Sequence, residues 1–362
     1  MNKRYYHIDL MEAIGILFVV IYHSGLYKYN FVKDAALNSE IVIYYLRYFL
    51  RTILSTCVPI FFFVNGYLLL SKPYDLSKHI QRTKHLILMP LWGLVLMPIY
   101  LLLDGQKISI KTSILNLLNI TTEWGMNLFW FIGALIVIYI FFPALKTLYD
   151  KDIKSFFSFV VVMFVLTFGI KLINQFLMFT GIVFHHHFTS INYPLINMFI
   201  PIRQYGYSFV YFCAGGLAFR YEKKILCVTK KKRNLIATCA IVISCTLLFL
   251  IGVFYSRFVL SDIWDVVWEG YDSIPTFINV LAIYTLTLNI DKGHEMIEYI
   301  SKNTLGIYLF HGLIIRATRP YLKSIEILCN YPVNIIYGLL IVLLSLMITK
   351  LLKSIPIIRS AL

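Results

Sequence analysis

Charge is scarce in this chain of 362 residues: only 14% of them are Asp, Glu, Lys or Arg, whereas 59% are hydrophobic. A soluble domain carries about 25% charged residues, so this chain has too few to cover a water-facing globule. A helix needs about 20 mostly apolar residues to cross the hydrocarbon of a bilayer. Runs almost free of charge occur at Ile14–Tyr22, Leu94–Leu103, Ile132–Leu145 and Ile335–Ile348. The composition therefore predicts an integral membrane protein.

Cysteine is also sparse, and the arrangements that would indicate a metal site are absent from the sequence. The six cysteines form no CxxC pair and mostly fall inside apolar runs, which is typical of small core residues. Three consecutive histidines, His185–His187, resemble a metal cluster, but adjacent histidines on one helix point in different directions. In a loop they could chelate, yet no other ligand is near in sequence. We therefore expect no metal site.

The net charge of +15 raises the question of nucleic acid, but the distribution of the charge indicates membrane topology instead. Lys and Arg collect in the cytoplasmic loops of membrane proteins. Here they bunch in alternate loops, whereas the loops between hold carboxylates such as Asp262, Asp265 and Glu269. The basic segments are 72–84, 146–154, 220–233 and 350–359. We expect no nucleic-acid partner.

The alternation of apolar runs and basic loops predicts an all-α bundle of about ten spanning helices with both termini cytoplasmic. The first apolar run is interpreted as a retained helix, because no cleavage site of small residues follows it. Residues 1–362 are expected to form one membrane-embedded domain, multi-pass in the cytoplasmic membrane, without a soluble domain. A further amphipathic stretch is expected at 40–50. The predicted spans are 8–28, 50–71, 86–103, 127–145, 155–174, 196–219, 234–254, 273–290, 303–320 and 332–350.

The largest outer loops are predicted at 29–49, 104–126, 175–195 and 255–272. The last of these, SRFVLSDIWDVVWEGYDS, mixes aromatic rings with carboxylates. An aromatic belt at the membrane surface explains that mixture most simply. The alternative is a sugar-binding lip, since aromatic faces and carboxylates suit hydroxyl-rich ligands.

Ionisable side chains inside a span are costly, which makes each a candidate for function. His23 lies eleven residues after Glu12 in the first span. Eleven residues make about three turns and about 16 Å, so the two share a face and His23 lies past the bilayer centre. An imidazole there could act as a general base or as a transient acyl acceptor. The alternative is a histidine that only packs helices together.

A second intramembrane histidine, His311, follows Tyr308 by three residues in TLGIYLFHGLII, so both can face one site. Gly306 and Gly312 in the same helix permit close helix approach. Taken alone, this segment favours helix packing over catalysis.

Polar and basic residues flank the second and third spans. Asn65 is a candidate for a polar kink facing the interior, together with Gly66. Arg82, Lys84 and His85 could contact the phosphates of a cytosolic donor. For any one of these cations, anchoring at the inner surface is the simpler explanation.

Arg203 begins a polar stripe near the outer start of the sixth span, followed by Tyr207 and Tyr211 at i+4 and i+8. Its guanidinium could snorkel to the interface. The alternative is that it points inward to a substrate.

Six segments, in order along nearly the whole chain, resemble the acyltransferase 3 family of bacterial membrane proteins that acylate surface glycans. The resemblance implies a catalytic role for His23, with Tyr308 and His311 in the same site. It also places Asn65 and Trp130 at family signature positions, which we assign to donor binding with Arg82 and Lys84. The segments are IDLMEAIGILFVVIYHSG, VPIFFFVNGYLLL, RTKHLILMPLW, LFWFIGALIVIYIFFP, YFCAGGLAFR and ISKNTLGIYLFHGLII.

One position departs from the family pattern, which has Arg or Lys eleven residues before the first histidine. Glu12 stands there in this chain, and a carboxylate cannot cradle the phosphates of acyl-CoA. We therefore assign Glu12 to substrate binding, with Arg203 and Tyr211. Phosphate contact is left to Arg82 and Lys84.

The resemblance implies transfer of an acyl group, with acetyl favoured, from cytosolic acyl-CoA to a hydroxyl of a cell-envelope or surface polysaccharide. Acyl-CoA is a donor substrate, and no permanently bound cofactor is expected. The expected partners are the lipid bilayer, a glycan or lipid-linked sugar acceptor, and proteins of envelope biosynthesis. An exporter of polysaccharide or lipid-linked sugar is the alternative, although no inverted repeats are visible. A non-catalytic scaffold or sensor is suggested only by Glu12.

Overall fold

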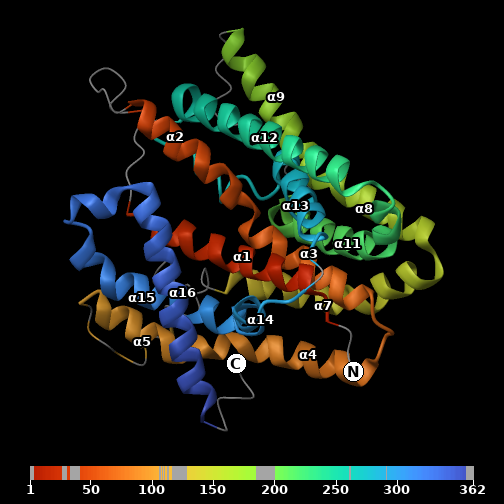
Figure 1. The fold of residues 1–362 in the computed structure, drawn as a ribbon, viewed down its shortest axis with the longest axis horizontal. Coiled ribbons are helices and arrows are strands. Elements are labelled where there is room, and N and C mark those ends of the chain that lie inside the picture. The colour runs from red at the N-terminus through yellow and green to blue at the C-terminus, as the bar shows by residue number, and fades with distance from the viewer. Residues whose placement is uncertain are drawn as a thin grey trace.

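The computed structural model describes residues 4–26, 31–32, 41–105, 107, 109, 111, 114–115, 129–184, 200–260, 262–290 and 292–355. Every regular element within these residues is a helix, which confirms the all-α prediction (Figure 1). The α-helices are α1 (Tyr6–Ser24), α2 (Ile41–Arg51), α3 (Cys57–Leu70), α4 (Leu76–Leu88), α5 (Gly93–Leu103), α7 (Trp130–Lys151), α8 (Ile153–Phe164), α9 (Ile170–Val183), α11 (Ile200–Leu226), α12 (Lys230–Phe254), α13 (Ile274–Thr287), α14 (Glu295–Lys302), α15 (Thr304–Leu322) and α16 (Tyr331–Lys353). Short 3₁₀ segments are η1 (Thr52–Thr56), η2 (Met89–Trp92) and η6 (Glu326–Cys329), and π segments are η4 (Val165–Gly169) and η5 (Tyr255–Val259).

Seven helical stretches of the described chain are long and apolar enough to cross a membrane. They are Tyr6–Ser24, Ile41–Leu70, Leu76–Leu103, Trp130–Lys151, Ile153–Val183, Lys230–Val259 and Tyr331–Lys353. The predicted spans at 196–219, 273–290 and 303–320 coincide with α11, α13 and α15, which are not among the seven. α13 has only 14 residues, about 21 Å of helix against a hydrocarbon core of about 30 Å. The total of ten spans and the side of the termini remain predictions.

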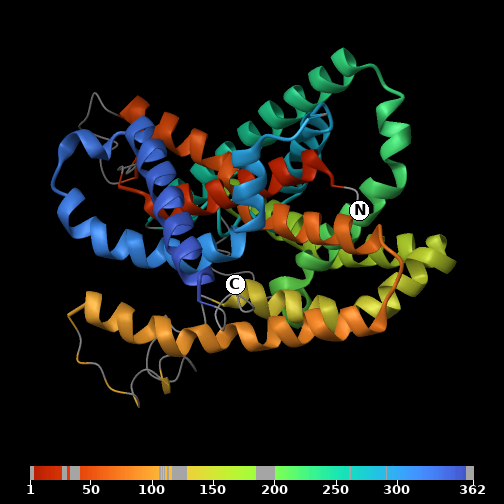
Figure 2. The same cartoon turned by 60° about the horizontal axis from the view of Figure 1, so that its bottom comes forward.

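α1 lies at the centre of the bundle (Figure 1) and contacts α3, α13, α14, α15 and α16. α4 and α5, joined through η2, form a long rod along one side of the molecule (Figure 2). Two separate clusters of buried apolar side chains result. The larger fills the space around α1, α3 and α11, and the smaller joins η2 and α5 to α7 and α15.

The closest helix crossing joins α3 to α11, and two glycines make it possible. A Cβ atom on Gly66 would lie 1.7 Å from the carbonyl oxygen of Phe212, and one on Gly215 would lie 1.9 Å from that of Phe63. Small residues let membrane helices touch backbone to backbone. Asn65 and Gly66, where the sequence suggests a polar kink, lie within one continuous helix from Cys57 to Leu70.

The amphipathic stretch expected at 40–50 is α2, which leads through η1 directly into α3. It buries Tyr44, Tyr48 and Arg51 and exposes apolar side chains such as Val42 and Leu46. A buried guanidinium at the end of this helix requires an anionic partner nearby.

The segment 262–272 folds inward over the bundle, so the aromatic-belt interpretation is wrong for its buried rings. Trp264 and Tyr271 are 5% and 3% exposed, whereas Trp268 is 43% exposed. The Tyr48 hydroxyl donates to the carbonyl of Trp264, and the Tyr211 hydroxyl donates to that of Tyr271. These two bonds fasten the segment to α2 and α11.

Candidate active site

The two intramembrane histidines meet in the structure. The Nε2 atom of His311 on α15 lies 3.2 Å from the Nδ1 atom of His23 on α1, and the ring centroids are 5.1 Å apart. His311 is 3% exposed, whereas His23 is accessible to solvent. His23 is therefore the histidine of the pair that a substrate can reach.

The surroundings of His311 fix which nitrogen of each ring carries hydrogen. Its Nδ1 atom lies 2.7 Å from the carbonyl oxygen of Tyr308 and 3.1 Å from that of Ile307. A carbonyl oxygen only accepts, so this nitrogen donates, and in a neutral imidazole the Nε2 atom is then an acceptor. The Nδ1 atom of His23 must donate to it. The basic lone pair of His23 is therefore on its Nε2 atom.

A cavity of about 150 Å³ approaches the histidine pair between α1, α3, α4, α7 and α15. It lies where the two apolar clusters meet. Val19 lines it one helical turn before His23, and Tyr308 lines it one turn before His311. The rings of Tyr308 and His311 are 6.1 Å apart. Its other lining residues include Glu12, Ile16, Asn65 and Leu86.

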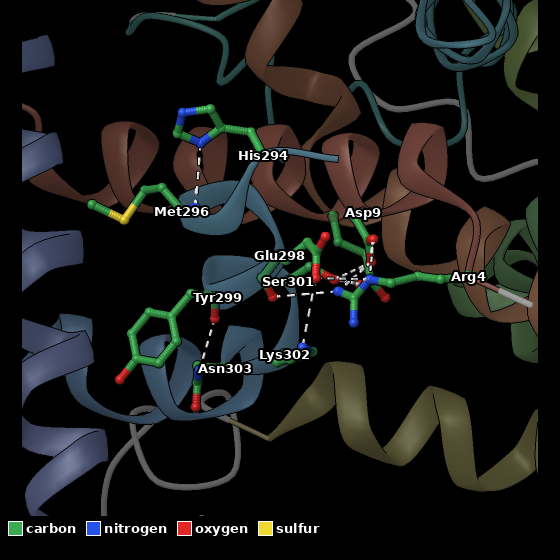
Figure 3. Close-up of polar contacts among 10 residues, drawn as sticks. Arg4, Asp9, His294, Met296, Glu298, Tyr299, Ser301, Lys302 and Asn303 are labelled. Atoms are coloured by element: carbon green, nitrogen blue, oxygen red, sulfur yellow. Dashed lines mark hydrogen bonds and ion pairs between the residues drawn. The ribbon is translucent and has the colours of Figure 1, made fainter. Parts of the chain in front are cut away.

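Glu12, which the sequence assigns to substrate binding, lines this cavity and also bonds to α14. The hydroxyl of Ser301 lies between Glu12 and Asp9, 2.9 Å from the Oδ1 atom of Asp9. Arg4 pairs with Asp9 through two contacts of 2.7 and 3.0 Å and approaches Glu298 at 3.4 Å (Figure 3). This network clamps the first turns of α1 to α14. Glu12 is thus part of a polar clamp at the cavity.

Two predicted donor residues, Arg82 and Lys84, lie exposed on α4. Leu86 lines the cavity one turn beyond Arg82, so Arg82 and Leu86 lie on the same face of the helix. Lys84 lies on another face of α4, because residues two positions apart in a helix do not face each other. Lys72, just before α4, is close enough that burial and the Arg82 guanidinium together lower the pKa of its ammonium. Crowding of like charges is typical of an anion site. Lys72 is a donor-site candidate that the sequence analysis did not single out, although it lies in the same basic segment.

The other two donor predictions lie in different places. Asn65 lines the cavity, where its amide nitrogen donates to the carbonyl of Phe61 and its oxygen accepts from Tyr139. Trp130 begins α7, about 14 Å along that helix from Tyr139. Its ring stacks with Tyr205 and Tyr271 at 5.6 and 6.0 Å. The structure therefore separates Trp130 from Arg82 and Lys84 and groups it with the 262–272 segment.

The remaining substrate predictions receive no support from the structure. Tyr211 is fully buried, and its hydroxyl is engaged with the Tyr271 carbonyl. The side chain of Arg203 and the run His185–His187 lie outside the described residues.

Sequence reasoning missed a polar cluster beside His23. The Asp265 carboxylate accepts a hydrogen bond from the Tyr22 hydroxyl at 2.6 Å and one from Arg51 at 3.3 Å. The rings of Tyr22 and His23 are 4.8 Å apart. A signal existed in the sequence, because Arg51 interrupts an apolar stretch and an arginine inside a membrane protein needs a counter-charge. Which carboxylate supplies it depends on the tertiary fold.

Comparison with known proteins gives one match. A family model described as an acyltransferase domain matches residues 5–352. Both histidines, the cavity and the 262–272 segment lie within the matched range. No curated protein and no solved structure matches the chain.

Proposed function

The chain belongs to the acyltransferase 3 family, and from that premise we propose that it transfers an acyl group from acyl-CoA to a hydroxyl of a cell-envelope glycan. Acetyl is the favoured group, because a small group suits a cavity of about 150 Å³. The proposed location is the cytoplasmic membrane, with the basic start of α4 facing the cytosol, where acyl-CoA is made.

The observation that carries the proposal is the contact between the two imidazole rings, with the Nδ1 atom of His311 facing two backbone carbonyls. His311 holds the Nδ1–H tautomer of His23, so that the opposite nitrogen of a solvent-accessible ring is basic. This is the arrangement of a general base with an orienting partner. A histidine that only packs helices needs neither an accessible ring nor an oriented lone pair.

The chemistry follows from this arrangement. His23 takes the proton from the acceptor hydroxyl at its Nε2 atom while the hydroxyl oxygen attacks the thioester carbonyl. A C–O bond forms and the C–S bond breaks. The proton on His23 then passes to the departing sulfur, which leaves as coenzyme A. The products are the acyl ester and coenzyme A, and His23 returns to its starting state.

The donor is proposed to bind from the side of α4. Its phosphates contact Arg82 and Lys72, and its thioester arm enters the cavity beside Leu86 and Asn65. The arm then ends near Tyr308, one turn from His311. This arrangement keeps the phosphates in water and the thioester among apolar side chains.

The test uses purified protein in lipid nanodiscs, acetyl-CoA labelled in the acetyl group, and the glycan fraction of source cells that lack the protein. We expect label in the glycan with wild-type protein. His23→Ala is expected to lower the rate about 10²- to 10⁴-fold, the usual contribution of a general base.

His294→Ala is the matched control, because this histidine is exposed at the start of α14 and bonds only the backbone of Met296 in the described structure. It is expected to transfer label at the wild-type rate. Label that stays on the donor with wild-type protein contradicts the proposal and favours an exporter. Normal transfer by a folded His23→Ala protein also contradicts it.

A further inference from the structure

A polar cluster formed by Tyr22, Arg51 and Asp265 borders His23. Tyr22 directly precedes His23 in α1, so the two side chains leave the helix about 100° apart. The ring contacts His23 at 4.8 Å and carries the Arg51 guanidinium over it at 4.8 Å. Its hydroxyl donates to Asp265 at 2.6 Å. The inward-folded segment therefore reaches the reacting histidine through Tyr22.

Asp265 is held in one orientation but keeps capacity to accept. Its Oδ2 atom accepts from Tyr22, and its Oδ1 atom accepts from Arg51 at 3.3 Å and from the Val267 backbone at 3.1 Å. A carboxylate offers about four acceptor positions, so one remains on Oδ2. The side chain is 37% exposed, whereas that of Arg51 is 7% exposed. The buried Arg51 guanidinium thus orients the Asp265 carboxylate, which remains accessible.

The neighbouring carboxylates of the segment are engaged elsewhere. Glu269 and Asp272 both pair with Lys171, at 3.4 and 3.3 Å. Asp262 accepts from the backbone nitrogen of Ile263. Among the described carboxylates of 262–272, Asp265 is the one bonded to a residue that touches the histidine pair.

We infer that Asp265 binds the acceptor, accepting a hydrogen bond from a hydroxyl next to the one that His23 deprotonates. The acceptor class is a vicinal diol on a sugar ring, because a carboxylate and an imidazole that both contact Tyr22 suit two neighbouring hydroxyls. This inference rests on the proposed acyl transfer and assigns its acceptor side. Arg51 and Tyr22 are positioning residues that aim the Asp265 carboxylate.

An aromatic ring on the same segment supports a sugar as the occupant. Trp268 is 43% exposed, and its ring packs edge-on to Trp130 at 5.1 Å and near Tyr271 at 5.7 Å. An exposed indole held by two other rings offers a rigid apolar face. The C–H face of a sugar ring packs against such a surface while its hydroxyls reach a carboxylate.

The experiment compares Asp265→Asn with Glu269→Gln as the matched control on the same segment. The probes are labelled acetyl-CoA and the glycan fraction of cells lacking the protein, with nanodisc-embedded enzyme. We expect Asp265→Asn to lower kcat/KM for the glycan about 10- to 100-fold, the effect of losing a hydrogen bond to a charged group. The change should fall mainly on KM for the glycan. Glu269→Gln is expected to behave as wild type.

Measurements of donor binding distinguish acceptor binding by Asp265 from a purely structural role. The Kd for coenzyme A, measured calorimetrically, should be unchanged in Asp265→Asn, and Asp265→Glu should recover part of the lost activity. An unchanged KM for glycan in Asp265→Asn overturns the inference, as does an equal loss on donor and acceptor sides. Failure of the wild type to transfer any label contradicts the proposed function instead, so the two failures are distinct.

Discussion

At the scale of single residues, the hydrogen bonds of His311 orient the imidazole ring of His23. His311 is buried and faces two backbone carbonyls, and its remaining nitrogen meets His23 at 3.2 Å. The spacing of Tyr308 and His311 predicts a shared face, and the structure confirms it. The tautomers could not be predicted, because they follow from carbonyls and a partner ring brought together only when α1 packs on α15.

The His311→Gln variant tests this role. The amide oxygen of Gln can accept from His23 but is less well placed than a ring nitrogen, so we expect kcat to fall about 10- to 100-fold, as for other orienting partners. His311→Leu removes the acceptor and should lower kcat further. The measurement is the transfer rate at saturating donor and acceptor. Equal rates in the Leu and Gln variants would show that His311 acts through packing alone.

At the scale of helices, the crossing of α3 and α11 is the tightest constraint on the bundle. The two backbones meet at Gly66 and Gly215, and α3 supplies Asn65 to the cavity from the same turn. The sequence places both helices to within seven residues at each end, at 50–71 and 196–219, although α11 is not among the seven apolar stretches. It does not predict which helices touch, nor that the 262–272 segment folds inward, since these depend on contacts between residues far apart in the chain.

Gly66→Ala is expected to destabilise this crossing severely. A methyl group 1.7 Å from a backbone carbonyl oxygen has no room, and overpacking in a core costs about 1–3 kcal/mol or more. The readout is the thermal unfolding midpoint of the purified protein in detergent. The control is Gly133→Ala on α7, where an added Cβ meets nothing within 4 Å. A midpoint in Gly66→Ala as high as in Gly133→Ala would contradict the packing.

At the scale of the whole molecule, two groups of polar residues lie toward the two ends of the central helix α1. The cavity and its nearby cations lie toward the start of α1, whereas Tyr22, His23 and the segment holding Asp265 lie at its end. The basic segments of the sequence predict the cations near the start of α1. The cluster at the end of α1 was not predictable, because Arg51 and Asp265 are 214 residues apart in sequence.

Removing cations from the α4 side should affect only the donor. Arg82→Gln combined with Lys72→Gln is expected to raise KM for acetyl-CoA about 10-fold at low salt, and less at high salt because exposed charges are screened. Both kcat and the KM for glycan should stay near wild type. Lys232→Gln, an exposed lysine in another basic segment, is the control. A similar increase in both proteins would indicate a general effect of net charge.

The clamp formed by Arg4, Asp9 and Ser301 has a consequence at the opposite end of α1. An α-helix is stiff along its axis, and residues 9 and 23 are separated by about 21 Å of it. A slide of one residue's rise, about 1.5 Å, at the first turn would be transmitted nearly undiminished and would open the 3.2 Å contact between the imidazoles. The contacts between the first turn of α1 and α14 therefore set the position of His23 along the axis of α1.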